Sequence, residues 1–264
     1  MLRTISVHLE LAIQGHTNMV FSMTPALGAE IVSERLDFSL AGVPQQAREI
    51  VDVHGTRLHT FVTGRGPLSV DYALEVAGRA APPPVDERDL ITYLRPSRYC
   101  ESDLLTPTAR SEFRGLSGHV LVQAVVDWVF ERLAYVSGSS LPTDGAARTL
   151  YNRQGVCRDF AHLTIALLRA MEVPARMVAV FAPGLSPMDF HAVVEAFVDG
   201  AWWLVDATHL APRQSMLRIS TGRDAADTAW LTSNWTDLSV MSMLVTVAAD
   251  SLPYDDGYER IQLG

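Results

Sequence analysis

The sequence reads GVCRDFAH from Gly155 to His162, a glycine turn followed by the start of an apolar helical pattern. This pattern predicts a helix over residues 157–171, with Cys157 at or near its first position. Unpaired backbone N–H groups and the positive end of the helix dipole stabilise a thiolate there. Cys157 is therefore a candidate nucleophile, which would need a histidine to shuttle protons and an acid to orient that histidine.

The regions on either side of this segment predict an α+β core. Apolar residues recur at helical spacing over residues 117–135, which predicts a long helix before the Cys157 segment. Pro174 ends the Cys157 helix, and three strands are expected after it, at residues 176–181, 190–198 and 202–208. Helices followed by an antiparallel sheet are typical of the α+β class.

Asp199-Gly200 joins the last two strands and predicts a hairpin with a type I′ turn. If these two residues form the turn, Asp206 lies opposite Val193, and His191 and Asp206 are diagonal neighbours on one face. Diagonal Cβ atoms are about 7 Å apart, within reach of an imidazole and a carboxylate. A slip of one residue would place the two side chains on opposite faces. His191 and Asp206 are thus candidate partners of Cys157, provided that the turn forms.

Upstream, the pattern is that of a separate β domain. Polar and apolar residues alternate over residues 5–13 and 68–76, as expected for strands with one buried face. The run Ala81-Pro82-Pro83-Pro84 interrupts regular structure, because proline lacks the N–H that a ladder needs. We therefore predict a β-sandwich-like domain over residues 1–80 and a catalytic domain over residues 81–264.

Composition excludes several classes of function. Of the 264 residues, 48% are hydrophobic and the net charge is −9, so neither nucleic acid nor an anionic membrane surface is an expected partner. The N-terminus contains no continuous apolar segment of the kind found in secretory signals. Two cysteines, Cys100 and Cys157, provide no disulfide framework, so a cytoplasmic location is expected.

Several motifs together resemble the bacterial branch of the transglutaminase-like superfamily. They are GVCRDFAH with Cys157, DFHAVVEAF with His191, WWLVDATH with Asp206, YLRPSRYCESD at residues 93–103 and GRDAADTA at residues 222–229. The resemblance implies a papain-like α+β core with Cys157 as nucleophile, His191 as general base and then acid, and Asp206 as the orienting carboxylate. Asp206 is followed by Ala207, where many members of the superfamily have proline.

The resulting hypothesis is acyl transfer from an amide of a peptide or protein through a Cys157 thioester. Water as acceptor would make the protein a peptidase or amidase, which we favour because water needs no second binding site; an amine would make it a protein-glutamine transglutaminase. A non-catalytic peptide-binding module is the opposing hypothesis. No cofactor is expected, because the sequence has no calcium-loop pattern and the set Cys157, His162, His191 and Asp206 is a weak zinc signature. His162 and Asp159 are interpreted as structural residues.

Overall fold

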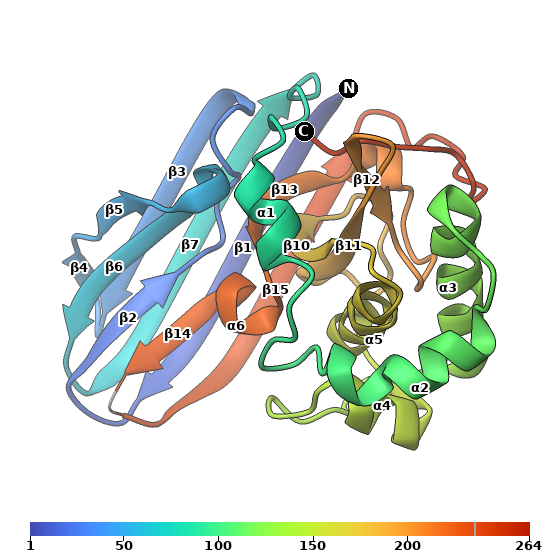
Figure 1. Ribbon diagram of the computed structural model, residues 1–264. Helices are drawn as coiled ribbons and strands as arrows, with labels where there is room; N and C mark the ends of the chain where they lie inside the picture. The colour runs from blue at the N-terminus through green and yellow to red at the C-terminus, as the bar shows by residue number, and fades with distance from the viewer. Residues whose placement is uncertain (235) are drawn as a thin grey trace.

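The computed structural model describes residues 1–234 and 236–264, and two antiparallel sheets form a β-sandwich on one side of it (Figure 1). The first sheet has the strand order β15 (Leu238–Ala249), β1 (Leu2–Ile13), β7 (Gly66–Ala77), β3 (Glu30–Leu40) and β4 (Val43–Gln45). The second has the order β14 (Leu231–Asn234), β2 (Thr17–Phe21), β6 (Arg57–Thr63) and β5 (Arg48–Val51).

Alternating residues build the core of this sandwich. In β1, Ile5, Val7 and Leu9 are buried while Thr4 and Ser6 are exposed, because successive side chains of a strand point to opposite faces. The strands predicted over residues 5–13 and 68–76 are confirmed as β1 and β7. Rings from both sheets meet between them: the centroid of Phe38 lies 5.0 Å from that of Phe21 and 4.9 Å from that of Phe61.

Two strands from the C-terminal part of the chain complete the sandwich. β15 pairs with β1 in antiparallel register, and β14 pairs with β2. The predicted second domain, residues 81–264, contains β14 and β15, whereas this pairing joins both strands to the N-terminal strands. The physical reason is that sheet partners are chosen by packing across more than 200 residues of intervening chain, which a local pattern does not encode.

The remaining chain forms an α+β part. Its sheet has the order β12 (Ala201–Val205), β11 (His191–Val198), β10 (Ala175–Phe181) and β13 (Leu217–Gly222), all antiparallel. The helices are α1 (Glu87–Thr92), α2 (Ser102–Glu112), α3 (Gly118–Arg132), α4 (Ala146–Asn152), α5 (Cys157–Ala170) and α6 (Ala225–Thr228). Short 3₁₀ turns η1 (Val53–Gly55) and η2 (Arg213–Ser215) and the parallel pair β8 (Ala134–Tyr135) and β9 (Gln154–Gly155) lie in the connections.

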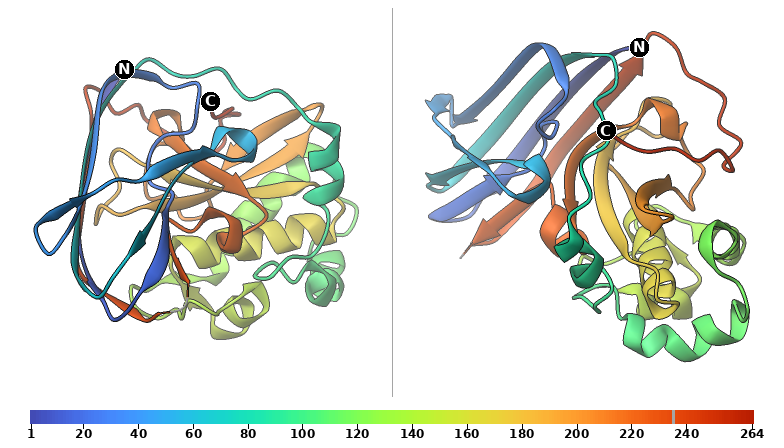
Figure 2. Two further views of the ribbon diagram at one scale, coloured as in Figure 1. Left: turned by 90° about the vertical axis from the view of Figure 1, so that its left-hand side faces the viewer. Right: turned by 45° about the horizontal axis from the view of Figure 1, so that its top comes forward.

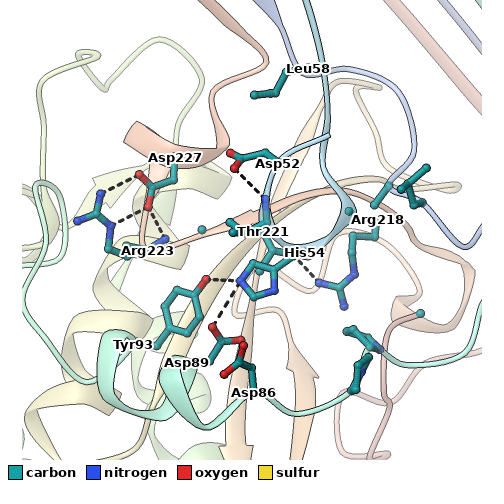
Figure 3. Close-up of a pocket in the computed structure, with 18 of the residues that line it drawn as sticks. Asp52, His54, Leu58, Asp86, Asp89, Tyr93, Arg218, Thr221, Arg223 and Asp227 are labelled. Carbon is teal, nitrogen blue, oxygen red and sulfur yellow. Dashed lines mark hydrogen bonds and ion pairs between the residues drawn. The ribbon is translucent and has the colours of Figure 1, made fainter. Parts of the chain in front are cut away.

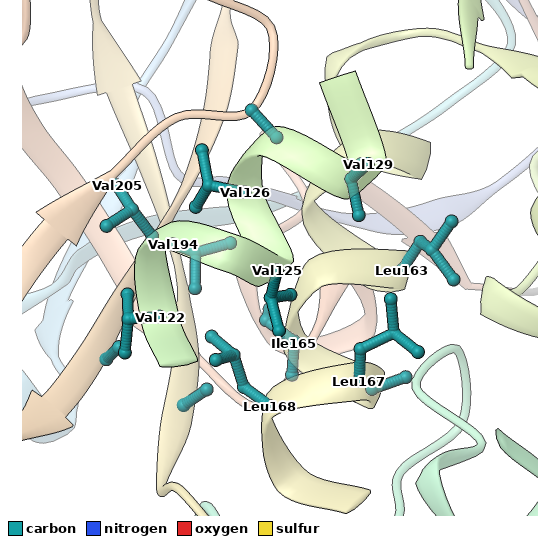
Figure 4. Close-up of a cluster of buried hydrophobic side chains, with 14 of the residues drawn as sticks. Val122, Val125, Val126, Val129, Leu163, Ile165, Leu167, Leu168, Val194 and Val205 are labelled. Carbon is teal, nitrogen blue, oxygen red and sulfur yellow. The ribbon is translucent and has the colours of Figure 1, made fainter. Parts of the chain in front are cut away.

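Helix α5 is the centre of the second hydrophobic core (Figure 4). It is buried over nearly its whole length, packing against α3 and against the sheet through Leu163, Ile165 and Leu168. Val194 of β11 and Val205 of β12 face the same cluster. This packing holds the first residue of α5 beside the start of β11, with Cys157 Sγ 4.0 Å from Phe190 O. The α+β class is confirmed, as are the helices predicted over residues 117–135 and 157–171, although the first of them ends at Arg132 and residues 134–135 form β8.

The helices of the described residues are short. The longest, α3, has 15 residues. In the part of the chain that the structure describes, no helix has both the length and the apolar character that crossing a membrane requires.

A buried ionic network connects the two parts of the molecule. Glu195 of β11 accepts hydrogen bonds from Arg176 Nε at 2.7 Å and from Arg218 NH1 at 3.1 Å. Arg176 NH1 also donates to Asp89 of α1 at 3.1 Å, and His54 of the sandwich lies 3.6 Å from the other oxygen of Asp89. Because each charge has a partner of opposite sign, the network can lie in the interior without an isolated charge.

Candidate active site

Cys157 is the first residue of α5, as the glycine turn predicts. Asp159 caps this helix end: its Oδ2 accepts a hydrogen bond from Val156 N at 2.8 Å, and its Oδ1 accepts one from Ser140 Oγ at 2.8 Å. Gly155 is required by this packing, because a Cβ at that position would lie 2.5 Å from Asp159 Cβ. Asp159 is therefore the structural residue that the sequence analysis expected, and it fixes the start of the helix.

His191 and Asp206 form a buried pair beside this helix end. His191 Nε2 lies 2.7 Å from Asp206 Oδ2, and their side chains are 0% and 2% exposed. The second carboxylate oxygen, Oδ1, accepts hydrogen bonds from the backbone N–H of Thr208 at 2.8 Å and from its hydroxyl at 2.7 Å. Both oxygens are thus bonded, which holds the carboxylate in one orientation against the imidazole.

The hairpin has the predicted register. Val198 pairs with Ala201 and Val194 with Val205, and both turn residues, Asp199 and Gly200, have positive φ. The ladder ends at the Val194–Val205 pair, so the strand predicted over residues 202–208 stops at Val205 and Asp206 is the first residue after it. The register still brings Asp206 to the side of the hairpin where it contacts His191.

Charge and burial act in opposite directions on this pair. Burial alone would lower the pKa of His191, but the charge and hydrogen bond of Asp206, helped by the neighbouring Cys157, raise it to about 10. Burial would raise the pKa of Asp206, but the charge of His191 and the hydrogen bonds lower it. At neutral pH the pair is therefore an imidazolium and a carboxylate.

The second imidazole nitrogen faces the nucleophile. His191 Nδ1 is buried and has no hydrogen-bond partner among the described residues, although Cys157 is close enough to affect the pKa of the ring. Cys157 Sγ lies 4.0 Å from the carbonyl oxygen of Phe190, the residue before His191. Contacts of this kind are commonly loose before substrate binds. Nδ1 is therefore the nitrogen available to exchange a proton with the thiol.

Removing the Asp206 charge should lower the pKa of His191. In Asp206→Asn, burial is no longer opposed by the carboxylate, so we expect the pKa to fall from about 10 to below the ordinary value of about 6.5. A histidine whose pKa is raised on folding stabilises the folded state fully below pH about 6.5, and this stabilisation is lost as the pH rises through about 10. The variant lacks this stabilisation, so its free energy of unfolding should be lower at neutral pH. Titration of the His191 Cε1–H resonance by NMR would measure the shift.

The matched control for that measurement is Asp189→Asn, which removes a carboxylate near His191 that makes no hydrogen bond to it. A His191 pKa that stays near 10 in Asp206→Asn would contradict the assigned origin of the shift.

Cys157 and His191 line a cleft of about 690 Å³ between the sandwich and the α+β part. Its apolar wall includes Met177, Phe190, Ile219, Trp230, Leu238 and Met243. The rings of Phe190 and Trp230 are stacked, with centroids 5.5 Å apart. Sequence analysis did not find these residues, because they come from separate segments that only the folded chain brings together.

Tyr135 is a second neighbour of the nucleophile that the sequence analysis missed. The β8–β9 pair places it opposite Gly155, two residues before Cys157. Burial and then the charge of Cys157 raise the pKa of its phenol to about 12, partly offset by a hydrogen bond from the Cys157 backbone N–H. The strand pairing thus places Tyr135 opposite a residue that is two positions before the nucleophile.

Three other residues of the sequence motifs, His162, Cys100 and Asp224, make structural contacts in the interior. His162 is 0% exposed, is stacked on Tyr99 with centroids 5.2 Å apart, and accepts a hydrogen bond from Ala225 N at 3.2 Å, so its Nε2 is occupied. Cys100 is also fully buried, and burial raises the pKa of its thiol. Asp224 joins the motifs at residues 93–103 and 222–229, since it accepts a hydrogen bond from Tyr99 N at 2.9 Å.

A larger cavity of about 1270 Å³ lies elsewhere, bounded by η1, α1, β13 and α6 (Figure 3). There the Tyr93 hydroxyl oxygen is 2.9 Å from His54 Nε2, and Arg223 is paired with Asp227 at 2.8 Å. None of Cys157, His191 and Asp206 lines it. Its charged groups lie where the sandwich meets the α+β part. We therefore place the candidate active site in the smaller cleft.

Comparison with known proteins supports this location. The sequence model described as the transglutaminase-like superfamily matches residues 117–207, a range that contains Cys157, His191 and Asp206. The crystal structure of a Cytophaga hutchinsonii protein named "putative cysteine protease" is 31% identical and has a TM-score of 0.87, covering 97% of this chain and 92% of that one. The likeness therefore includes the sandwich as well as the α+β part.

Two further proteins resemble this chain less than the Cytophaga hutchinsonii protein does, either over a shorter stretch or with a lower similarity. The uncharacterized protein ML0607 of Mycobacterium leprae is 30% identical over 142 residues, which are 48% of this chain. The matched part of this chain spans 50% of the length of that relative. The periplasmic domain of TgpA from Pseudomonas aeruginosa is 18% identical with a TM-score of 0.42, covering 78% of this chain and 91% of that one.

Proposed function

The chain belongs to the transglutaminase-like superfamily, and from this premise we propose that it is a cysteine enzyme that cleaves amide bonds of peptides or proteins. The observation that carries the proposal is the 2.7 Å contact between His191 Nε2 and Asp206. The opposite ring nitrogen has no hydrogen-bond partner among the described residues, and Cys157 lies close to the ring at a helix N-terminus. Proposed catalytic residues are Cys157 as nucleophile, His191 as acid and base, and Asp206 as the group that orients His191.

In the first half-reaction the Cys157 thiolate attacks the amide carbonyl carbon. The new S–C bond pushes an electron pair onto the oxygen, and the backbone N–H of Cys157 and the nearby Tyr135 hydroxyl are the groups proposed to stabilise it. The tetrahedral intermediate collapses, the C–N bond breaks, and the His191 imidazolium gives its proton to the leaving nitrogen. A thioester on Cys157 and a neutral imidazole result.

In the second half-reaction His191 takes a proton from water, whose oxygen attacks the thioester carbon. The C–S bond breaks, the acid is released, and the proton on His191 again faces the thiolate. An amine in place of water would give transglutamination by the same steps. We propose hydrolysis because water requires no second binding site.

The proposal can be tested without knowing the substrate, through the pH dependence of Cys157 alkylation by iodoacetamide. A thiol with no neighbouring imidazolium should react roughly 75-fold faster at pH 8 than at pH 6, as its thiolate fraction rises. If Cys157 and His191 react as the proposed pair, the rate at Cys157 should change by less than about 3-fold over this range. Intact mass and a peptide map would give the rate at each cysteine.

His191→Ala is the matched variant, and it should restore the steep pH dependence. Cys100 gives an internal reference, because it is fully buried and should react only after unfolding. A steep profile in the parent protein would overturn the proposal of an activated nucleophile.

A cytoplasmic location is proposed on the cysteine content, since Cys100 and Cys157 are both free thiols. We propose a peptide or protein substrate and no nucleic-acid partner, given the net charge of −9.

A further inference from the structure

Strand β15 forms an open edge of the sandwich. It is the last strand of its sheet, and it lies on the side of the sandwich that faces the α+β part (Figures 1 and 2). Its sequence, LSVMSMLVTVAA, has 12 residues without a charge or a proline. Proteins usually protect exposed strand edges with charges, prolines or bulges that prevent another strand from pairing. Only a bulge opposite Glu10 and Leu11 is present here.

The register identifies which backbone groups of this edge are open. Asp250 N donates to Leu2 O of β1, whereas Val247 N points the other way and lies 3.3 Å from Met188 Sδ. Since these directions alternate along a strand, the backbone groups of Met243 and Val245 also point away from β1. Neither has a backbone partner on that side within the described residues.

The open segment adjoins the candidate active site. Met188 belongs to the loop that leads to Phe190 and His191, and this loop meets the edge at Val247. Val245 is 3% exposed, so its backbone is also covered, whereas Met243 is 38% exposed. Met243 lines the same cleft as Cys157. A chain extended along this edge would thus be continuous with the reaction site.

The residues that line the cleft also indicate which kind of substrate side chain would fit it. Phe190, Trp230 and Met243 provide apolar surface. Apart from His191, whose imidazolium is paired with Asp206, the charged residues that line the cleft are already bonded: Arg158 NH2 donates to Leu141 O at 2.7 Å, and Asp189 Oδ1 accepts from Phe190 N at 2.7 Å. An aromatic or large aliphatic side chain therefore fits better than a charged one.

We propose that the acyl part of an extended peptide substrate binds as an additional strand on the open edge of β15. Backbone hydrogen bonds to the N–H and C=O of Met243 hold the peptide, and an apolar side chain enters the cleft beside Phe190 and Trp230. The acyl part is the occupant because Cys157 retains it through both half-reactions, so its binding contributes to both. This inference rests on the proposed function.

Peptide aldehydes test it, because they contain only the acyl part. The Cys157 thiolate adds to the aldehyde carbon, the oxygen takes the proton of the His191 imidazolium, and the adduct protects Cys157 from iodoacetamide. We expect acetyl-Ala-Ala-phenylalaninal to protect at a concentration at least about 10-fold lower than acetyl-phenylalaninal, which is too short to pair with β15. The aspartal analogue of the longer aldehyde should protect at least about 10-fold less well than its phenylalaninal counterpart.

The decisive variant is Met243→Pro, which deletes the outward N–H while leaving the β1 ladder intact, as proline at an edge strand allows. It should reduce the advantage of the longer aldehyde to less than about 3-fold. Met243→Ala is the matched control, because it keeps the N–H and should keep the length advantage. If Met243→Pro keeps the full advantage, strand addition to β15 is wrong.

N-methylation of each amide of the longer aldehyde in turn tests the parent protein directly, and it decides the question if Met243→Pro does not fold. Alternate amides of an added strand face β15, so the amide that faces Met243 should be sensitive and its neighbours in the peptide should not. Equal effects at all positions, or none, would overturn the inference. If alkylation of Cys157 is pH-independent but no aldehyde protects it, this inference fails while the proposed function stands; a steep alkylation profile means that the proposed function has failed.

Discussion

Hydrolysis of a peptide pool is expected to disappear in Cys157→Ala, because no other nucleophile is available to form the acyl-enzyme. The substitution should leave the fold intact, since the side chain is only partly buried and α5 is held by residues beyond its first turn. A tryptic digest of casein is a suitable pool, with newly formed α-amines reporting hydrolysis. Incorporation of dansylcadaverine in the same samples would report transfer to an amine.

Three further variants make this test specific to the proposed triad. Cys157→Ser should retain very little activity, because its hydroxyl is far harder to ionise than a thiol. His191→Ala should lose roughly 10⁴-fold in kcat, and Asp206→Asn a similar or smaller factor, since residues that act as a unit give losses that do not add. Turnover that persists in Cys157→Ala would show that the nucleophile is misassigned, and a parent protein without turnover would favour the peptide-binding module.

Glu195→Leu should destabilise the protein more than any surface substitution. Glu195 is 0% exposed and lies between Arg176 and Arg218, whose side chains are 1% and 5% exposed. Loss of the carboxylate leaves two buried guanidinium groups without their shared partner, which typically costs about 3–5 kcal/mol. For a chain of this size the expected fall in Tm is about 10 °C, measurable by calorimetry.

Arg35→Ala provides the control, because it breaks an ion pair with Asp37 in which Arg35 is 80% exposed. Such a pair contributes less than about 1 kcal/mol, so its Tm should hardly change. Equal effects of the two substitutions would mean that the buried network does not contribute to stability as described.

The predictions that succeeded from sequence rest on short-range physics. The glycine turn and helical periodicity predicted Cys157 at the first position of α5. This worked because helix ends and apolar helix faces are determined by a few consecutive residues. Asp199-Gly200 fixed the register of the hairpin and hence the approach of His191 to Asp206, because a two-residue turn leaves one pairing. These local rules were sufficient to bring two of the three proposed catalytic residues together.

The sequence by itself thus determined the α+β core, the helix that carries Cys157 and the hairpin that joins His191 to Asp206. Only the tertiary structure decided that β15 returns to pair with β1, that Tyr135 lies beside Cys157, and that Trp230 and Met243 form a wall of the cleft. The physical reason is that pairing between Met243 and Leu9 depends on which sheet buries the most apolar surface for the whole chain. The pairing partner of a strand therefore cannot be recognised from a short stretch of sequence, whereas a turn or the start of a helix can.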